Sequence, residues 1–265
     1  MDYTQIAYTT QGPVARISHN RPKARNAESQ NLLTELDAAL HQATVDENVR
    51  VIVFDAQGDH FSAGHDLKEA ALKRADFTVE QRWAYEELYY FECSMRIWDC
   101  PKPTIAQVQG ACIAGGFMVA NMCDIVIASE DAFFADPVCQ TLGAAAVEVL
   151  IHPWVMGARK SKEFLFTGRK MLAQEAHAIG MVNKVVSRAD LESETTAMAE
   201  QIAQAQPFAL KLVKRSINRT LDGQGMRTAL QAHFDTHQLS HVTEAFKVAR
   251  DQGLESAIKR GREQG

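Results

Sequence analysis

Two glycine-containing loops carry residue types that could bind a negatively charged oxygen. Ala63-Gly64-His65-Asp66 follows an apolar run at 51–54, and Gly110 to Gly116 follows a second run at 104–108. Apolar runs of this length predict strands buried on both faces, and each loop leads into a predicted helix. Because the first N–H groups of a helix lack intrahelical acceptors, two such loops that converge could hold an oxyanion. The same glycines could instead serve only to form tight turns.

The sequence lacks the common phosphate-binding and serine-hydrolase motifs. It has no GxxxxGK[ST], Gly110 to Gly116 does not fit GxGxxG, and the GxSxG pattern fails because His60 replaces its first glycine. His233, His237 and His241 share one face of a predicted helix, a spacing that can bind zinc. A solvated or interfacial histidine face is the favoured interpretation, and no metal is predicted.

The elements that must position these loops alternate between strands and helices up to about residue 135, which predicts an α/β fold. Two short strands are expected over 5–18, and further strands at 124–128 and 132–134. Helices are predicted at about 29–44, after Asn26 as a turn or cap residue, and at about 78–99. From about residue 141 the pattern is almost wholly helical. We expect a core over residues 1–206 and a helical region over residues 207–265, beginning at Pro207.

Length and charge set limits on the class of protein. The chain has 265 residues, with 28 Lys+Arg against 33 Asp+Glu and a formal net charge of −5. This composition suits a folded domain and argues against a bulk nucleic-acid binder. The acidic total hides a basic C-terminal region, because residues 207–265 hold ten basic and six acidic residues, a charge of +4. Residues 1–206 hold 18 basic and 27 acidic residues, or −9.

Cysteine usage and hydropathy favour a cytoplasmic location. Five cysteines without a CxxC pair are expected to be buried, reduced thiols. No secretory signal is visible at the N-terminus. The longest apolar stretch, at 111–123, is far shorter than the roughly 20 residues needed to span a bilayer. We therefore expect no membrane partner.

Several blocks of the sequence, taken in order, resemble the enoyl-CoA hydratase/isomerase family, the crotonases. They are NRPKARNA at 20–27, FSAGHDLKE at 61–69, KPTIAQVQG at 102–110, AGG at 114–116, CDIVIA at 123–128, LFTG at 165–168, AQEA at 173–176 and GMVN at 180–183. Their order and spacing match over about residues 5–190. The resemblance implies a crotonase-like spiral of ββα units with a C-terminal all-helical region that assembles a homotrimer or a dimer of trimers.

The resemblance also implies an acyl-CoA thioester as substrate, so that coenzyme A is part of the substrate and no separate cofactor is expected. Backbone N–H groups of His65 and Gly115 would hold the thioester oxygen and stabilise an enolate. Lys259 and Arg260 are weaker candidates for the CoA phosphates, acting from another subunit. The stronger candidates for the CoA arm and its phosphates are Ala63, Asp66, Leu67 and Lys68 together with the cationic loop residues Arg21, Lys23 and Arg25.

The sequence departs from the family pattern at its catalytic carboxylates. The two glutamates of the hydratases correspond to Met118 and Val138, and an acidic position of some isomerases and dehalogenases falls near Ala145. Water addition needs groups that activate water and deliver a proton, and Met and Val can do neither. Hydration by the usual two-glutamate route is therefore not expected.

Four other side chains are candidates for acid–base chemistry. Glu148, in an apolar context, would have a raised pKa and could act as acid or base, or could form a salt bridge instead. Asp136 could act similarly or cap the following turn, and the imidazoles of His65 and His152 are further candidates. The sequence thus predicts an acyl-CoA-transforming enzyme: an isomerase, a C–C hydrolase, a thioesterase or an unusual hydratase. A non-catalytic acyl-CoA binding protein is the alternative, and a metalloenzyme built on the histidine helix is a third possibility.

Overall fold

A six-stranded sheet organises the computed structural model, which describes residues 2–252. β1 (Ile6–Gln11) and β2 (Val14–His19) form an antiparallel hairpin. Every further strand adds in parallel, in the order β1-β2-β3-β4-β6-β9. The added strands are β3 (Val51–Ala56), β4 (Thr104–Val108), β6 (Ile125–Ser129) and β9 (Lys184–Val186). Every residue of β3 and β4 is buried, which confirms the prediction of strands covered on both faces.

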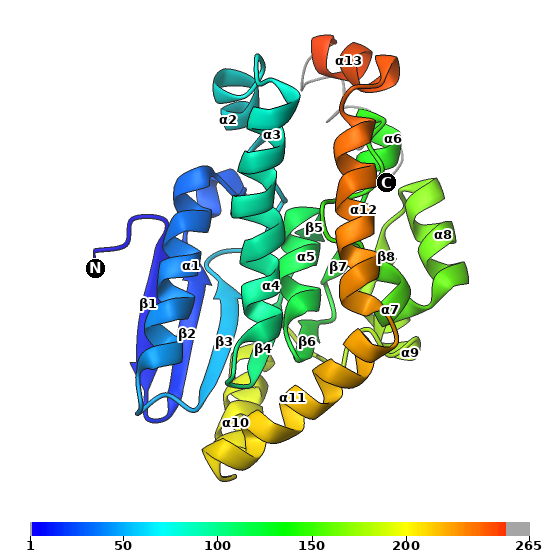
Figure 1. The fold of residues 1–265 in the computed structure, drawn as a ribbon. Coiled ribbons are helices and arrows are strands. Elements are labelled where there is room, and N and C mark those ends of the chain that lie inside the picture. Colours follow the sequence, from blue (N-terminus) through cyan, green and yellow to red (C-terminus); the bar gives the residue numbers. More distant parts are fainter. Residues whose placement is uncertain (1, 253–265) are drawn as a thin grey trace.

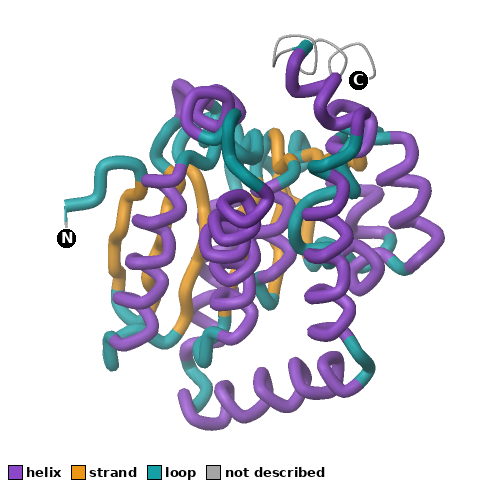
Figure 2. Tube along the Cα trace, turned by 45° about the horizontal axis from the view of Figure 1, so that its top comes forward, coloured by secondary structure: helices purple, strands orange, loops and turns teal. Residues whose placement is uncertain are grey.

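Helices cover both faces of this sheet. α1 (Gln30–Val45), α4 (Glu92–Asp99) and α5 (Gly115–Met122) lie in front of the strands in Figure 1 and again in Figure 2. α10 (Leu191–Ala203) covers the other face, where its apolar side chains pack on β3, β4 and β6. The predicted helix at 29–44 corresponds to α1 and buries its leucines as the 3.6-residue period requires.

A second, three-stranded sheet redirects the chain toward the glycine-containing loops. Its order is β5-β7-β8, from β5 (Ala111–Ile113), β7 (Phe133–Ala135) and β8 (Met171–Leu172). The chain leaves β4 for β5 at Gly110, whose φ is +53°. A Cβ at this position would lie 2.2 Å from the Asp59 carbonyl oxygen, so glycine is required there.

The helix predicted at 78–99 is interrupted by a π-helical segment. It comprises α3 (Val79–Glu86), η2 (Glu87–Phe91) and α4, and Thr78 begins it with a capping box that includes Gln81. α2 (Leu67–Lys73) precedes it, with Asp66 as its N-cap. A 3-10 turn, η1 (Pro22–Ala24), lies in the cationic loop before α1. π segments inside α-helices often occur at functional sites.

The C-terminal part of the described chain is helical. α6 (Val138–Leu142), α7 (His152–Met156), α8 (Ala158–Thr167) and α9 (Ala173–Ala178) are short. α11 (Pro207–Gly223) crosses the bottom of the molecule in Figure 1, α12 (Met226–Ser240) rises beside α5, and α13 (Glu244–Asp251) lies above. Pro207 stands in the first turn of α11, as predicted. None of the described helices is long and apolar enough to cross a membrane. Lys259 and Arg260 lie outside the described residues.

Of the two roles that the sequence allows for Asn26, turn or cap, the structure shows the turn. Ser29 caps α1, and its side chain accepts a hydrogen bond from the Leu32 N–H. Asn26 adopts φ +54° and donates to the carbonyl oxygens of Gln57 and His60, so it holds the preceding turn. The expectation of an almost wholly helical chain after residue 141 is wrong for β8 and β9, which are too short to show a strand period.

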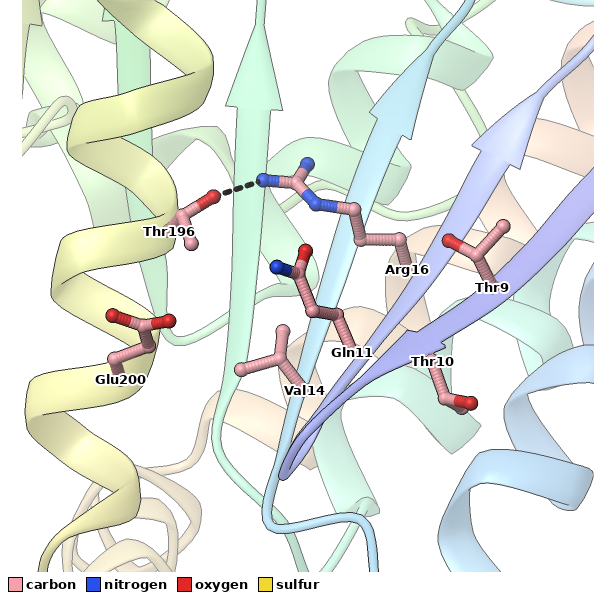
Figure 3. Close-up of a pocket in the computed structure, with 7 residues that line it drawn as sticks. All are labelled: Thr9, Thr10, Gln11, Val14, Arg16, Thr196 and Glu200. Carbon is pink, nitrogen blue, oxygen red and sulfur yellow. Dashed lines mark hydrogen bonds between the residues drawn. The ribbon is translucent and has the colours of Figure 1, made fainter.

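A cleft of about 310 Å³ opens between the β1–β2 hairpin and α10 (Figure 3). Arg16 in its wall is ion-paired with Asp55 at 2.6 Å and donates to the Thr196 hydroxyl at 2.7 Å. Its charge is therefore already neutralised within the fold. The residues that the sequence singles out lie elsewhere. The cleft is lined by Thr9, Thr10, Gln11, Val14, Arg16, Thr196 and Glu200.

Candidate active site

The two glycine-containing loops meet beyond the carboxyl ends of β3 and β5. Gly64 has φ +85°, and a Cβ there would lie 2.8 Å from the Ile113 carbonyl oxygen and 3.3 Å from the backbone nitrogen of Gly115. Among the described residues, neither the N–H of His65 nor that of Gly115 has a hydrogen-bond acceptor. Two unpaired N–H groups therefore lie on adjoining loops, one of them at the first turn of α5.

Glu28 and His65 lie directly on Gly115. The backbones of residues 28 and 65 form an isolated parallel bridge, in which the Glu28 N–H donates to the Gly64 carbonyl oxygen at 2.8 Å. A Cβ at position 115 would lie 1.9 Å from Glu28 Oε2 and 2.6 Å from the His65 ring. A Cβ at position 115 would therefore force the Glu28 or His65 side chain to shift.

The His65 imidazole lies between two buried glutamates. Its Nε2 is 3.7 Å from Glu28 Oε2, and its Nδ1 is 3.6 Å from Glu148 Oε1. The ring stacks on Tyr90, with centroids 3.7 Å apart and planes 8° from parallel. Both glutamates are almost wholly buried, whereas the His65 side chain keeps 15% of its surface exposed. Three groups able to transfer protons therefore share one desolvated site beside Gly115.

Burial and neighbouring charges separate the pKa values of the two glutamates. Burial raises the pKa of the Glu28 carboxyl to about 8, against a hydrogen bond from the Ser62 hydroxyl that lowers it. Burial alone would raise the pKa of Glu148, but the imidazoles of His65 and His237 outweigh it, and the pKa of Glu148 lies well below its usual range. The prediction of a raised pKa at Glu148 is therefore wrong. Burial lowers the pKa of His65, so this imidazole is neutral at pH 7.

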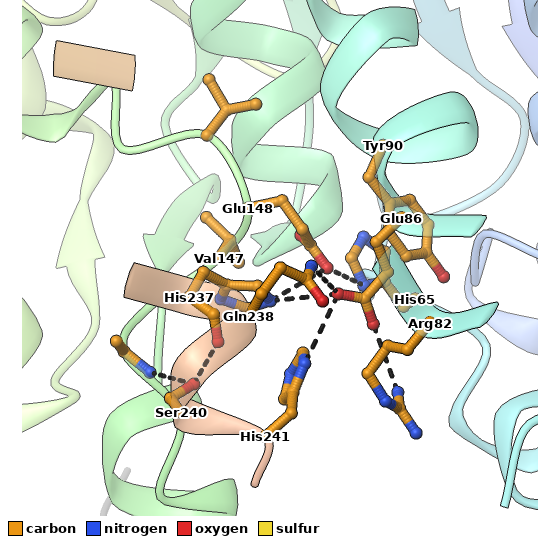
Figure 4. A network of polar contacts seen from close by, with 12 residues as sticks. His65, Arg82, Glu86, Tyr90, Val147, Glu148, His237, Gln238, Ser240 and His241 are labelled. Atoms are coloured by element: carbon orange, nitrogen blue, oxygen red, sulfur yellow. Dashed lines mark hydrogen bonds and ion pairs between the residues drawn. The ribbon is translucent and has the colours of Figure 1, made fainter. Parts of the chain in front are cut away.

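Glu148 also belongs to a polar cluster between α3 and α12 (Figure 4). His237 Nε2 lies 3.5 Å from both Glu148 Oε1 and Glu86 Oε2, and His241 Nδ1 lies 3.5 Å from Glu86 Oε2. Gln238 donates to Glu86 Oε2 at 2.7 Å. Burial alone would lower the pKa of His237, but the carboxylates of Glu148 and Glu86 raise it to about 10. Helix α12 thereby stabilises the ionised form of Glu148.

Asp136 stabilises the loop that carries Glu148. Its Oδ1 and Oδ2 accept hydrogen bonds from the N–H groups of Val138 and Val147, both at 3.2 Å. Oδ2 also lies 3.3 Å from His152 Nε2, and both side chains are fully buried. These contacts give Asp136 the capping role that the sequence analysis offers as an alternative to catalysis. His152 packs behind it on Phe117, with ring centroids 4.4 Å apart.

Met118 and Ala145, two of the positions where the family pattern predicts a carboxylate, contact or belong to the same loop. Met118 is buried, and its Sδ lies 3.3 Å from the Val149 nitrogen. Val138 is the half-buried first residue of α6. The N–H of Ala145 donates to the Ser240 hydroxyl at 3.2 Å. Met118 and Ala145 therefore help to hold the loop around Glu148, and none of the three side chains can act as an acid or a base.

The predicted CoA neighbours fall into two groups. Arg21 is ion-paired with Asp66 at 2.9 Å and also donates to the Ala27 carbonyl oxygen. The side chains of Lys23, Arg25 and Lys68 are exposed, and within the described chain they form no ion pair. Ala63 and Leu67 flank His65 along the loop, and the Ala63 N–H donates to the Arg25 carbonyl oxygen. The structure thus brings the cationic loop and the His65 loop together.

Three residues of this site are not predicted from the sequence. Glu28 directly precedes a predicted helix, where an acidic residue usually belongs to the exposed first turn. Tyr90 and Glu86 lie in a helix whose π segment is not visible in the apolar period. Glu28 lies next to His65 because residues 28 and 65 form a parallel bridge. The spacing of residues along the sequence does not predict this contact.

Comparison with known proteins identifies the family. The family model for enoyl-CoA hydratase/isomerase matches residues 9–260. The putative enoyl-CoA hydratase EchA13 of Mycobacterium tuberculosis is 42% identical over 260 residues, covering 91% of this chain and 82% of that protein. The 4-chlorobenzoyl coenzyme A dehalogenase-2 of an Arthrobacter species is 34% identical over 206 residues, covering 77% and 74%.

Solved structures agree with this assignment. An enoyl-CoA hydratase/isomerase from Xanthobacter autotrophicus superposes with a TM-score of 0.92 at 37% identity, covering 100% of this chain and 99% of that one. A probable enoyl-CoA hydratase from Mycobacterium smegmatis gives a TM-score of 0.85 at 47% identity, covering 89% and 94%. The predicted crotonase-like α/β fold with a helical C-terminal region is confirmed. The chain is a member of the enoyl-CoA hydratase/isomerase family and an acyl-CoA enzyme.

Proposed function

We propose that this enzyme stabilises a thioester enolate with the N–H groups of His65 and Gly115, and transfers protons with Glu28, His65 and Glu148. The observation that carries the proposal is the row formed by Glu28, His65 and Glu148. His65 Nε2 lies 3.7 Å from Glu28 Oε2, and its Nδ1 lies 3.6 Å from Glu148 Oε1. Glu28 and His65 also lie against Gly115. These three side chains supply acid–base groups in a chain where Met118 and Val138 stand in place of the hydratase glutamates.

Two unpaired N–H groups on adjoining loops support an oxyanion hole. The Gly115 N–H opens α5, where the helix dipole also favours negative charge. The Gly64 conformation, φ +85°, lets the His65 loop approach it closely. A preorganised donor of this kind contributes about a hundred- to a thousand-fold in rate.

The protonation states suit a proton shift within the acyl chain. Glu148 is ionised and can act as the base that removes a proton from the carbon next to the thioester, which forms the enolate. Glu28 has a pKa of about 8, so at pH 7 it retains a proton that it can deliver elsewhere on the chain. The neutral His65 ring lies between them and can return the proton from Glu148 to Glu28 after each turnover, accepting it at Nδ1 and releasing one from Nε2. This chemistry is isomerisation, and it needs no activated water.

We assign the exposed cations Lys23 and Arg25 of the loop before α1, together with Lys68 of α2, to the CoA phosphates. Lys23, Arg25 and Lys68 are exposed near the His65 loop, whereas Arg21 positions Asp66 through its ion pair. We also propose that the chain assembles into a homotrimer or a dimer of trimers through its helical region.

A non-catalytic acyl-CoA binding protein is the second candidate. The contact that favours it is the close packing of Glu28 and His65 on Gly115, which leaves little room beside this backbone. The two candidates then differ in whether a hydrogen on the carbon next to the thioester exchanges with solvent.

Deuterium exchange separates the two candidates. Saturated acyl-CoA and arylacetyl-CoA esters, which all carry a hydrogen on the carbon next to the thioester, are incubated with the protein in D2O, and deuterium at that carbon is followed by NMR. We expect exchange with at least one ester, and about a hundred-fold loss in Glu148→Gln. Glu200→Gln, on the far side of the sheet, serves as the matched control.

Each other result has a defined meaning. Tight ester binding without exchange across the panel would favour the binding protein. Release of free CoA thiol would indicate a thioesterase, whereas cleavage of the acyl chain with the thioester intact would indicate a C–C hydrolase. Efficient hydration of crotonyl-CoA by the wild type would show that replacement of the two glutamates does not prevent hydration, and would overturn the isomerase assignment.

A further inference from the structure

A second group of potential ligands lies next to the proposed active site. Glu86 of α3 and His237 and His241 of α12 each offer one ligand atom, and these three atoms lie within 4.8 Å of one another. Figure 4 shows the side chains converging between the two helices. His237 is 2% exposed and Glu86 is 4% exposed, so the group is screened from water.

Two imidazole atoms at the centre of this group lack hydrogen bonds. Within the described part of the chain, His237 Nε2 and His241 Nδ1 have no hydrogen-bond partner, although both are buried. Their separations from Glu86 Oε2, 3.5 Å each, exceed the 2.7–3.2 Å of ordinary N–H···O bonds. Two ligands about 2.05 Å from one tetrahedral zinc ion are roughly 3.3–3.4 Å apart. The spacing therefore suits ligands of a shared cation better than direct partners.

We propose that Glu86, His237 and His241 bind one divalent transition-metal ion, with zinc the best match. Two imidazoles and one carboxylate are a ligand set that zinc commonly takes, with the fourth position left to water or another residue. Glu148 Oε1, at 3.5 Å from His237 Nε2, is the protein atom nearest to that role.

The surroundings of the three ligands support this assignment. Arg82 lies 3.2 Å from Glu86 Oε1 and Gln238 donates to Glu86 Oε2, so the carboxylate is fixed from outside the group. Such outer contacts orient the ligands of metal sites. Two buried carboxylates, Glu86 and Glu148, face the same imidazole nitrogen, and a divalent cation there would neutralise both. The competing occupant of this position is a proton on His237.

The structure changes the histidine triplet that the sequence suggests. His233 Nε2 lies 2.9 Å from the Val147 carbonyl oxygen and is outside the ligand group, and Glu86 takes its place. The ion would tie α12 to α3 and place positive charge beside Glu148. The inference concerns the ligand group alone and does not depend on the proposed reaction.

Metal analysis of protein purified without a histidine tag tests the site. We expect about one zinc per chain in the wild type, and visible d–d bands of four-coordinate Co²⁺ after chelation and cobalt titration. His241→Gln and Glu86→Gln should each weaken binding by about 100-fold or more. His233→Gln, on the same helix, and His41→Gln, an exposed histidine, should leave it unchanged.

The result that would overturn the site is equally defined. The site is contradicted if the wild-type protein binds far less than one metal ion per chain after Zn²⁺ titration and its Co²⁺ spectrum cannot be distinguished from that of His241→Gln. His237 would then carry the competing proton. Circular dichroism of each variant checks folding, and His241→Gln, at the end of α12, keeps the test informative if Glu86→Gln does not fold.

Discussion

Glu28 and Glu148 approach the two nitrogen atoms of one imidazole, yet they hold protons very differently. The protonated imidazole of His237 keeps Glu148 ionised, whereas Glu28 has no comparable cation and takes a pKa of about 8 from burial. Two carboxyl groups whose environments push their pKa values apart are the usual division between an acid and a base.

The raised pKa of Glu28 predicts how stability depends on pH. The folded protein retains a proton on Glu28 that the unfolded chain loses above about pH 4.5, so this contribution is fully present below pH 4.5 and is lost as pH rises to about 8. Glu28→Gln should therefore flatten the fall in the free energy of unfolding between pH 5 and 8, by about 2–4 kcal/mol. Urea unfolding at several pH values measures it.

Glu35→Gln is the matched control for that experiment. Hydrogen bonds from Thr4, Gln5 and Asn31 outweigh burial and lower the pKa of Glu35, so its contribution is lost only as pH falls below about 4.5. The slope between pH 5 and 8 should stay that of the wild type. An unchanged slope in Glu28→Gln would mean that Glu28 is ionised in the folded protein.

The contact of Glu28 and His65 with Gly115 predicts a strong effect of a single methyl group. Gly115→Ala places Cβ 1.9 Å from Glu28 Oε2, so we expect about 1–3 kcal/mol of destabilisation and loss of proton exchange. Adding Glu28→Ala should restore part of the stability, because the closest contact is removed. Chemical denaturation of both variants measures this coupling.

Gly223→Ala separates this effect from glycine replacement in general. A Cβ at position 223, in the last turn of α11, meets no atom within 4 Å, so its stability should equal or exceed that of the wild type. Equal stabilities of Gly115→Ala and Gly223→Ala would contradict the packing argument.

At the scale of elements, the π segment sets how α3 faces the site. Removing Leu88 from η2 would convert Val79–Asp99 to a continuous α-helix and rotate α3 by about 100° relative to α4. Because the buried face of α4 holds that helix in place, the rotation should move Glu86 away from His237 without unfolding the protein. We expect activity to be lost with a nearly unchanged circular dichroism spectrum.

Leu88→Ala controls for the loss of the side chain, which is 48% exposed, and should retain activity. A deletion variant with wild-type activity would show that the π segment does not orient Glu86.

The loop from β7 to α7 depends on one buried carboxylate. Asp136→Asn replaces an acceptor oxygen with an NH2 group facing the N–H of Val138 or Val147, at a cost of about 1–3 kcal/mol. Asp131→Asn, at an exposed pair with Arg188, should change stability by less than about 0.5 kcal/mol. Thermal unfolding compares them, and equal effects would rule out the capping role.

For the whole molecule, the sequence predicts most of the architecture and only part of the site. Long elements such as β3 and α1 are recognisable because burial on two faces, or on one face of a helix, leaves a period in the sequence. His65 and Gly115 follow from glycine placement and the family resemblance. Glu28 reaches His65, and Glu86 reaches His237, only through tertiary contacts between distant segments, which a local pattern does not encode.

The outer face of α11 predicts assembly. Phe208 and Ile217 are 68% and 57% exposed, and Leu212 and Val213 lie between them, also exposed, on the same helix. A contiguous apolar face of this kind marks a protein contact surface. We expect three or six chains per particle by light scattering, and dissociation in Phe208→Glu/Ile217→Glu. Lys211→Glu changes an exposed charge on the same helix and should leave the assembly intact. A monomeric wild type would contradict the proposed trimer, and an intact double variant would place the interface elsewhere.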